Sequence, residues 1–209
     1  MPDPVLHIDT LLKELGFERV ASLQAARAVL IEAGLTNARK QNIAADKRAR
    51  VVEAVEAGIA RYCGQPTCLA LLEADGRRPV EVAPRFCEVC GGSDITRAVN
   101  RMAQDLVATG RRRLLVVGGS PNAHTQLRTS LAGSGVELDT VAGDRPTGAK
   151  RAREMVERAD VVVIWANTIL DHKVSSVFTG VAPARTFTCA RRSVSALAQE
   201  VSRHVTGAA

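Results

Sequence analysis

Aromatic residues are scarce in this chain: four Phe, one Trp and one Tyr make up 3% of its 209 residues. A platform that stacks the bases of single-stranded nucleic acid needs several exposed rings, so the scarcity argues against such a surface. Long apolar runs are also lacking. The longest, Val161 to Ala166, is strand-sized and far short of the roughly 20 residues of a membrane span. The N-terminus lacks the basic and then apolar pattern of a signal peptide. We therefore expect a cytoplasmic protein without a membrane partner.

The charge of the chain is unevenly distributed. The formal net charge is +6; residues 111–209 hold fourteen Lys and Arg against eight Asp and Glu, whereas residues 1–110 hold fourteen of each sign. A basic domain raises the local concentration of anions such as phosphates and nucleic acid, so the C-terminal half is the part expected to bind an acidic partner. A solvated arginine-rich surface without a partner is the alternative.

Four of the five cysteines fall within one window of 28 residues, as Cys63-x4-Cys68 followed by Cys87-x2-Cys90. In a cytosolic chain such paired cysteines favour a structural zinc site over disulfides, because four thiolates close a tetrahedral shell. We expect a zinc-ribbon-like module over residues 61–95, with Gly91 and Gly92 turning the chain after the second pair. A short hairpin between Leu69–Leu72 and Val80–Val82 would complete it. Metal-free cysteines, a redox dithiol at Cys87 and Cys90, and an iron–sulfur site remain alternatives.

Residues 1–60 are predicted to be helical. Asp9, Ser22 and Asn37 are candidate N-caps of three helices, the third running from Asn37 to Ile59. The compact junction at residues 32–37 is typical of a helix-turn-helix. Cations near the start of the third helix suit phosphate and base-edge contacts, and the candidate nucleic-acid-binding residues are Arg39, Lys40, Lys47, Arg48 and Arg50. A helical packing or dimerisation module is the alternative.

A connecting amphipathic helix at residues 96–110 leads into a repeating strand–helix pattern at 111–209. Strands are predicted at 113–117, 136–141, 160–165 and 184–189, and helices at 126–131, 147–158, 173–181 and 194–205. This alternation indicates an α/β fold with a four-stranded parallel sheet, Rossmann-like and with a flavodoxin-like strand order. The apolar third strand is typical of one covered on both faces.

Candidate ligand-binding residues gather where these four strands end. Parallel strands present their carboxyl ends at one edge, where ligands of such sheets bind. A glycine-rich turn before a helix is an anion site, and Ser193 can cap the last helix beside two arginines. The candidates are Gly118, Gly119, Ser120, Asn122, His124, Asn167, His172, Arg191, Arg192 and Ser193. The pattern is neither GxGxxG nor a P-loop. Glycines that merely allow tight packing, and ordinary loop histidines, are the alternatives.

Several pieces of this half resemble a known family. They are the stretch from Leu114 to Gly119, the stretch from Ala159 to Ile164, His172, and the stretch from Arg192 to Leu197. In order and spacing, residues 112–206 resemble the bacterial family catalogued as domain of unknown function 2325. The resemblance implies a small Rossmann-like module behind helical or cysteine-containing extensions, and it suggests His172 and Ser193 as site positions. It implies no activity.

Two classes of function fit these patterns best. The favoured one is a zinc-containing regulatory binding protein, a homodimer, whose basic domain binds nucleic acid or a nucleotide-like anion. The other is an enzyme acting on a phosphorylated or nucleotide substrate, with His172 or His124 as acid–base groups. The enzyme is disfavoured because the candidate edge offers only Asp144 and Asp171 for a catalytic magnesium ion. A scaffold that binds protein partners is a third possibility.

Overall fold

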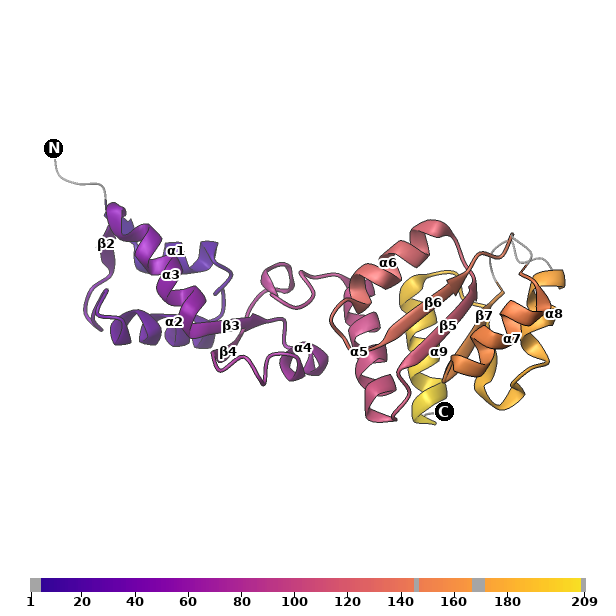
Figure 1. Cartoon of the computed structure of the whole chain (residues 1–209). Coiled ribbons are helices and arrows are strands. Elements are labelled where there is room, and N and C mark those ends of the chain that lie inside the picture. Colours follow the sequence, from indigo (N-terminus) through magenta and orange to yellow (C-terminus); the bar gives the residue numbers. More distant parts are fainter. Residues whose placement is uncertain (1–4, 145–146, 167–171, 208–209) are drawn as a thin grey trace. The chain divides into compact units, whose positions relative to one another are not determined.

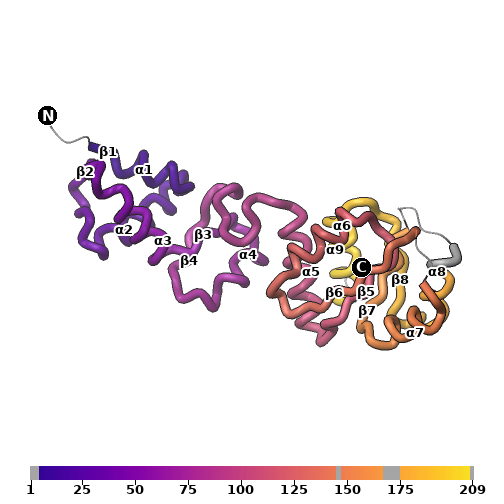
Figure 2. The backbone as a smooth tube through the Cα atoms, turned by 45° about the horizontal axis from the view of Figure 1, so that its top comes forward, coloured from indigo at the N-terminus to yellow at the C-terminus, as the bar shows by residue number. Residues whose placement is uncertain are grey.

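The computed structural model describes residues 5–144, 147–166 and 172–207 and divides the chain into two compact units (Figures 1 and 2). The N-terminal unit comprises Met1–Ser93, and the C-terminal unit comprises Asp94–Ala209. Among the helices of the described residues, none is long and apolar enough to cross a membrane.

The N-terminal unit packs its three longest helices against two small pairs of strands. Its elements are β1 (Val5–His7), α1 (Ile8–Glu14), α2 (Val20–Glu32), β2 (Asn42–Ala44), α3 (Arg48–Gly58), β3 (Ile59–Tyr62), α4 (Pro66–Ala70) and β4 (Arg78–Glu81). One core joins the helices to the strands: Leu12 of α1, Leu30 of α2 and Val55 of α3 pack in the same cluster as Ile59 and Val80. The strands that flank the cysteine segment are therefore anchored in the helical core.

The helix expected to begin at Asn37 begins instead at Arg48. Residues 42–44 form β2, which pairs antiparallel with β1 and places Ile43 opposite Leu6. The Asn37 side chain accepts hydrogen bonds from the N–H groups of Arg39 (3.0 Å) and Lys40 (3.1 Å), so it closes a turn rather than capping a helix. Fifteen residues, 33–47, connect α2 to α3. The compact helix-turn-helix junction expected at residues 32–37 is therefore not observed.

Two expected helix caps are also corrected. Asp9 lies inside α1, whose N-cap is His7. Ser22 lies in the first turn of α2, where its hydroxyl donates to the Arg19 carbonyl (2.9 Å) and accepts from the Arg19 N–H (3.2 Å). In both cases the helix is present, but it starts before the residue that carries the capping signal.

The expected hairpin of a zinc ribbon is absent from the described chain between the cysteine pairs. β3 and β4 pair in parallel, with Arg61 opposite Val80, and the connection between them contains α4. Parallel neighbours cannot be joined by a tight turn, so the intervening residues cross over from the end of β3 to the start of β4.

The C-terminal unit is an α/β fold with a four-stranded parallel sheet, as predicted. Its elements are α5 (Asp94–Ala108), β5 (Arg113–Gly118), α6 (Pro121–Leu131), β6 (Glu137–Val141), α7 (Ala149–Arg158), β7 (Val161–Trp165), α8 (His172–Thr179), β8 (Thr186–Cys189) and α9 (Val194–Thr206). The strand order is β6-β5-β7-β8. β5 is central, with Val117 opposite both Val141 of β6 and Ile164 of β7.

Helices cover both faces of this sheet (Figure 1). On one face α5, α6 and α9 pack over Val116 and Val163. On the other, α7 and α8 pack over Val117 and Val162. All five residues of β7 are buried, which confirms the prediction of a doubly covered strand. The carboxyl edge of the sheet is therefore flanked by α5, α6 and α9 on one side and by α7 and α8 on the other.

Candidate metal centre and sheet-edge site

Four sulfur atoms meet in the N-terminal unit. The Sγ atoms of Cys63, Cys68, Cys87 and Cys90 all lie within 4.8 Å of one another. The Sγ of Cys63 is 3.7 Å from the Sγ of Cys68 and 3.7 Å from that of Cys90. A tetrahedral ion with metal–sulfur bonds of about 2.3 Å requires sulfur–sulfur separations of roughly 3.8 Å. The prediction that the two pairs converge is confirmed, and their spacing fits a metal ion rather than disulfide bonds, whose sulfurs lie about 2 Å apart.

Short turns bring the cysteines into place. Cys63 directly follows β3 and Cys68 lies in α4, where its N–H donates to the carbonyl of Gln65 (3.0 Å). Cys87 follows a 3-10 turn at Pro84–Phe86. After Cys90 the chain turns away through Gly91 and Gly92, whose φ angles of +53° and +84° are conformations that favour glycine.

The protonation of the buried thiols depends on whether a metal ion is bound. Burial raises the pKa of the Cys63 thiol and that of the Cys68 thiol above the ordinary value. Without an ion, both groups are therefore protonated at neutral pH. A bound cation reverses this preference, because metal ligation requires the thiolate. Four protein ligands leave no open position for a substrate, so the centre can brace the fold but is not built for catalysis.

Ion pairs hold the second cysteine pair against β3. Glu88, between Cys87 and Cys90, accepts hydrogen bonds from Arg61 Nε (3.0 Å) and Arg77 Nη2 (2.8 Å). Burial favours the neutral acid, but the two guanidinium groups outweigh it and lower the pKa of Glu88. Arg77 also donates to the carbonyl of Ile59 (2.9 Å). Glu88 thus ties the metal-binding turn to the start and the end of β3.

In the C-terminal unit, the loop after β5 rests on a tryptophan ring. Gly118 lies opposite Trp165 in the sheet, and Gly119 has a φ of +90°. A Cβ on Gly119 would come within 2.6 Å of the Trp165 ring and 3.1 Å of His124 Nε2. The Trp165 indole N–H donates to the carbonyl of Arg191 in the loop after β8. One buried side chain therefore links the loops that follow β5 and β8.

The predicted ligand residues have different surroundings. His124 is buried, and its Nε2 lies 2.7 Å from the Gly118 carbonyl oxygen. Ser120 and Ser193 cap helices: their hydroxyls accept from the N–H of Ala123 (3.2 Å) and Ala196 (3.1 Å). Asn122, Arg191 and Arg192 are exposed, and His172 is the first residue of α8, while Asn167 lies outside the described residues. The strands bring Gly118, Gly119, Ser120, Arg191, Arg192 and Ser193 to the same edge.

The sequence analysis missed two residues that support these sites, Trp165 at the sheet edge and Glu88 at the cysteine cluster. The sequence pattern places Trp165 in a strand, and its place at the carboxyl end of a parallel strand is also a signal for a site position. The sequence analysis gives Glu88 no role; its pairing with Arg61 and Arg77 depends on the parallel β3–β4 pair, which the local sequence does not reveal.

The basic residues predicted to bind nucleic acid in the N-terminal unit do not share one helix. Arg39 and Lys40 lie in the loop before β2, Lys47 ends a 3-10 turn, and Arg48 and Arg50 lie in the first turn of α3. The side chain of Arg48 pairs with Glu14 (3.0 Å). The recognition helix that would have presented all five is therefore not formed as predicted.

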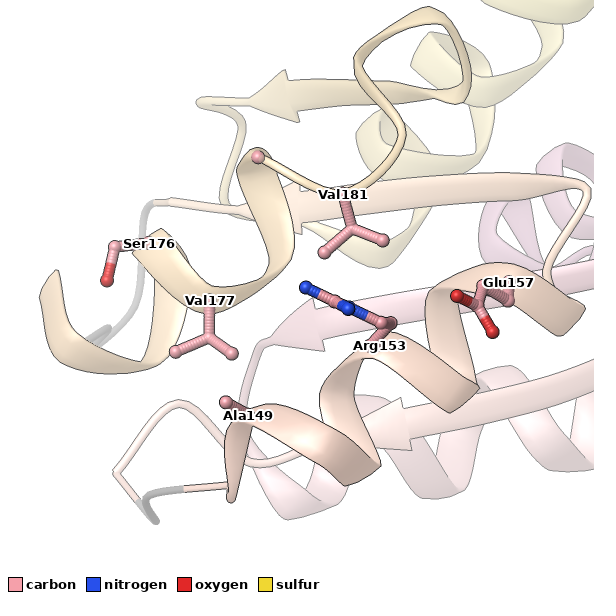
Figure 3. A pocket seen from close by; sticks show the side chains of 7 residues that line it. Ala149, Arg153, Glu157, Ser176, Val177 and Val181 are labelled. Atoms are coloured by element: carbon pink, nitrogen blue, oxygen red, sulfur yellow. The ribbon is translucent and has the colours of Figure 1, made fainter.

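A groove lies between α7 and α8, and none of the residues predicted to bind a ligand is among those that line it (Figure 3). Arg153 and Glu157 line it from α7, and Val177 and Val181 line it from α8 and the residues that follow. Figure 3 shows the Arg153 side chain extending across the groove toward the two valines. The groove mixes apolar and charged groups and contains none of the capped helix starts described above.

No family model matches the chain, and no curated protein or solved structure matches it either.

Proposed function

We propose that this protein is a zinc-containing regulatory binding protein whose C-terminal unit, a Rossmann-like module, binds a phosphate-bearing ligand at the carboxyl edge of its sheet. The ligand is a nucleotide or the phosphate group of a nucleic acid. The likeness of residues 112–206 to the bacterial domain of unknown function 2325 is part of this proposal, as are a cytoplasmic location and a homodimeric state.

The observation that carries the proposal is the reversal of strand order at β5. From β5 the chain proceeds to β6 on one side through α6, and it then returns to β7 on the other side through α7. Sheets wound in two directions bind ligands in the crevice outside the strand ends at this switch point, here between β5 and β7. Gly118, Gly119 and Trp165 lie there.

The chemistry at this edge supports an anion. The helices α6 and α9 both begin here, each with a serine cap. Their positive dipole ends favour a phosphate, and Arg191 and Arg192 add charge beside α9. Because His124 is buried against the Gly118 carbonyl, it is poorly placed as an acid–base group, which favours binding over catalysis.

In the N-terminal unit, the proposed ion is zinc. Four sulfur ligands and a closed shell match the preference of Zn²⁺ in structural sites, and the sulfur–sulfur distances of 3.7 Å fit its bond length. The ion would tie β3, α4 and the turn after β4 together.

A fluorescence titration tests the ligand site, because Trp165 is the chain's single tryptophan. ADP, GDP and inorganic phosphate are the probes. We expect a saturable change in emission with at least one nucleotide, and an affinity at least about tenfold lower in the double variant Arg191→Gln, Arg192→Gln, since each lost charge-assisted hydrogen bond costs about 1.5–3 kcal/mol.

The matched control removes two positive charges from α5, as Arg97→Gln with Arg101→Gln, and should bind like the unaltered protein. The ligand-site proposal fails if none of the probes changes the emission up to millimolar concentrations, or if both double variants bind equally well.

A further inference from the structure

A group of arginines gathers at the amino edge of the C-terminal sheet, opposite the proposed ligand site. We call Arg112, Arg113, Arg158 and Arg185 the amino-edge arginines. All four are exposed. Arg113 begins β5, Arg158 ends α7, and Arg185 directly precedes β8.

Hydrogen bonds fix these residues at one end of the sheet. Arg185 Nη1 donates to the carbonyl of Ala159, the residue after Arg158 (2.8 Å). The N–H of Asp160 donates to the Arg113 carbonyl (2.8 Å). The guanidinium of Arg111 donates to the Val205 carbonyl near the end of α9 (2.8 Å), so this helix ends beside the same edge (Figure 1).

Two carboxylates, those of Asp160 and Glu137, lie beside the four amino-edge arginines and offset part of their charge. Asp160 accepts the backbone N–H groups of Arg112 (2.8 Å) and Arg113 (2.9 Å), so hydrogen bonds to the backbone occupy its Oδ2. Glu137 pairs with Arg113 at 3.4 Å across an exposed surface. Within the described residues, Arg112, Arg158 and Arg185 form no ion pair, and Glu157 of α7 pairs with none of them.

The net positive charge of the chain comes entirely from the C-terminal unit. Residues 94–209 contain sixteen Lys and Arg against ten Asp and Glu, whereas residues 1–93 contain twelve of each sign. The whole excess of six positive charges is therefore in the C-terminal unit, and the four amino-edge arginines, which outnumber the neighbouring carboxylates of Glu137 and Asp160, carry part of it.

We propose that the amino-edge arginines bind the phosphate backbone of a nucleic acid. All four are arginines, whose planar guanidinium matches phosphate oxygens in a bidentate manner. The starts of β5 and β8 lie two strand spacings apart, about 10 Å. Along one nucleic-acid strand, phosphates recur about every 3.4 Å of helix axis, so this span reaches several of them.

A membrane surface fits less well. Interfacial binding normally combines basic residues with apolar anchors. The large hydrophobic side chains found exposed within the described ranges are Val5, Val20, Ile31 and Leu71, and all four lie in the N-terminal unit. The inference goes beyond the proposed ligand site, because the two surfaces lie at opposite edges of the sheet and can be tested separately.

The test compares two full-length variants that each lose three positive charges. The first replaces arginines at the amino edge: Arg112→Gln, Arg158→Gln, Arg185→Gln. The control replaces exposed cations in the first turns of α7: Lys150→Gln, Arg151→Gln, Arg153→Gln. Fluorescence anisotropy with a labelled 20-base-pair DNA duplex and a labelled 20-nucleotide RNA, at several salt concentrations, gives the affinity and its salt dependence. Thermal melts confirm that both variants fold.

For the amino-edge variant we expect at least about tenfold weaker binding at 50 mM salt. For the duplex, the slope of log affinity against log salt should become shallower by about three, or by about two for RNA, because each lost phosphate contact removes 0.9 or 0.7 from it. The control should keep most of the slope. The duplex and the RNA distinguish the two kinds of nucleic acid. Equal losses in both variants, unchanged binding in the amino-edge variant, or no binding by the unaltered protein would overturn the proposal.

Discussion

Gly119 lies where the loop after β5 meets the Trp165 ring, and two constraints act on this one residue. Its φ of +90° is costly for a residue with a side chain, and a Cβ would approach the ring to 2.6 Å. Gly133 has a similar φ of +76°, but a Cβ there would have no neighbour within 4 Å. Alanine at Gly133 would therefore add backbone strain alone, whereas alanine at Gly119 would add both backbone strain and steric overlap.

We predict that Gly119→Ala lowers the free energy of unfolding by about 2–4 kcal/mol, and Gly133→Ala by about 1 kcal/mol, since only the first adds overlap to an unfavourable backbone conformation. Urea unfolding followed by tryptophan emission measures both. Equal losses in the two variants would show that the loop yields easily and does not rest firmly on the indole.

At the same scale, Asp9 and Arg27 make the unfolding of the N-terminal unit depend on pH. Arg27 Nε lies 2.6 Å from Asp9 Oδ1, and this hydrogen bond lowers the pKa of Asp9 from its ordinary 3.8. A carboxyl whose pKa is lower in the folded state stabilises the fold above the unfolded pKa, and this contribution is lost as the pH falls.

Asp9→Asn should therefore lower the free energy of unfolding by about 0.5–1 kcal/mol at pH 7, as expected for a half-buried pair that solvent still screens. The difference between the variant and the unaltered protein should shrink as the pH drops below about 4, where Asp9 becomes protonated in the unfolded chain. Urea midpoints from pH 3 to 7 provide the comparison. A difference that stays constant over this range would exclude the ion pair as its source.

Among the elements, α9 shows what a single cap contributes. The Ser193 hydroxyl accepts from the Ala196 N–H, one of the N–H groups that the first turn cannot satisfy within the helix. Ser193→Ala should lower the stability by about 1 kcal/mol, while Ser193→Thr retains the acceptor and should cost less. Gln199→Ala, at an exposed position in the middle of the same helix, is the control. Differential scanning calorimetry measures these shifts, and an equal shift in the control would argue against capping.

The elements of the C-terminal unit could be predicted because their signals are local. Each strand is a short apolar or alternating run, and glycines such as Gly118 and Gly133 mark the ends. β2 could not be predicted in this way. Its pairing with β1 brings together residues far apart in the chain, and the turn that Asn37 closes carries the same residue signal as a helix cap.

In the candidate sites, too, the features with local sequence signals could be predicted, and those that depend on distant contacts could not. Convergence of the two cysteine pairs could be predicted from their spacing, because paired cysteines at such intervals are typical of a metal site. The support from Glu88 could not, since it depends on the parallel β3–β4 pair that replaced the expected hairpin. At the sheet edge, sequence reasoning identified the loops, but the contacts of Trp165 with Gly119 and Arg191 required the fold.

For the whole molecule, the two units should differ in their response to metal removal. The cysteine cluster lies entirely within residues 1–93, and Trp165 lies in the other unit. Purified protein should contain one zinc ion per chain. A chelator should destabilise the N-terminal unit, because the ion's binding free energy contributes to its folding. Hydrogen exchange should then accelerate in β3 and β4 but not in β5 and β7.

Cys87→Ser should abolish zinc retention in elemental analysis, whereas Cys189→Ala, which alters the buried cysteine at the end of β8, should leave it intact. Iron in place of zinc would favour an iron–sulfur site. Retention of a full equivalent by Cys87→Ser would contradict a four-sulfur centre.

The parallel pairing of β3 with β4 should also govern how fast the N-terminal unit folds. A crossover separates the strands, with Cys63 and Cys68 at its beginning and Cys87 and Cys90 beyond its end. Chains lose loop-closure entropy before such distant contacts form, which slows their folding. An ion captured early by both cysteine pairs would close this loop in advance, a constraint comparable to the roughly 3 kcal/mol that a cross-link removes from an unfolded chain. The availability of zinc during synthesis would then determine how long the N-terminal unit remains exposed to proteases.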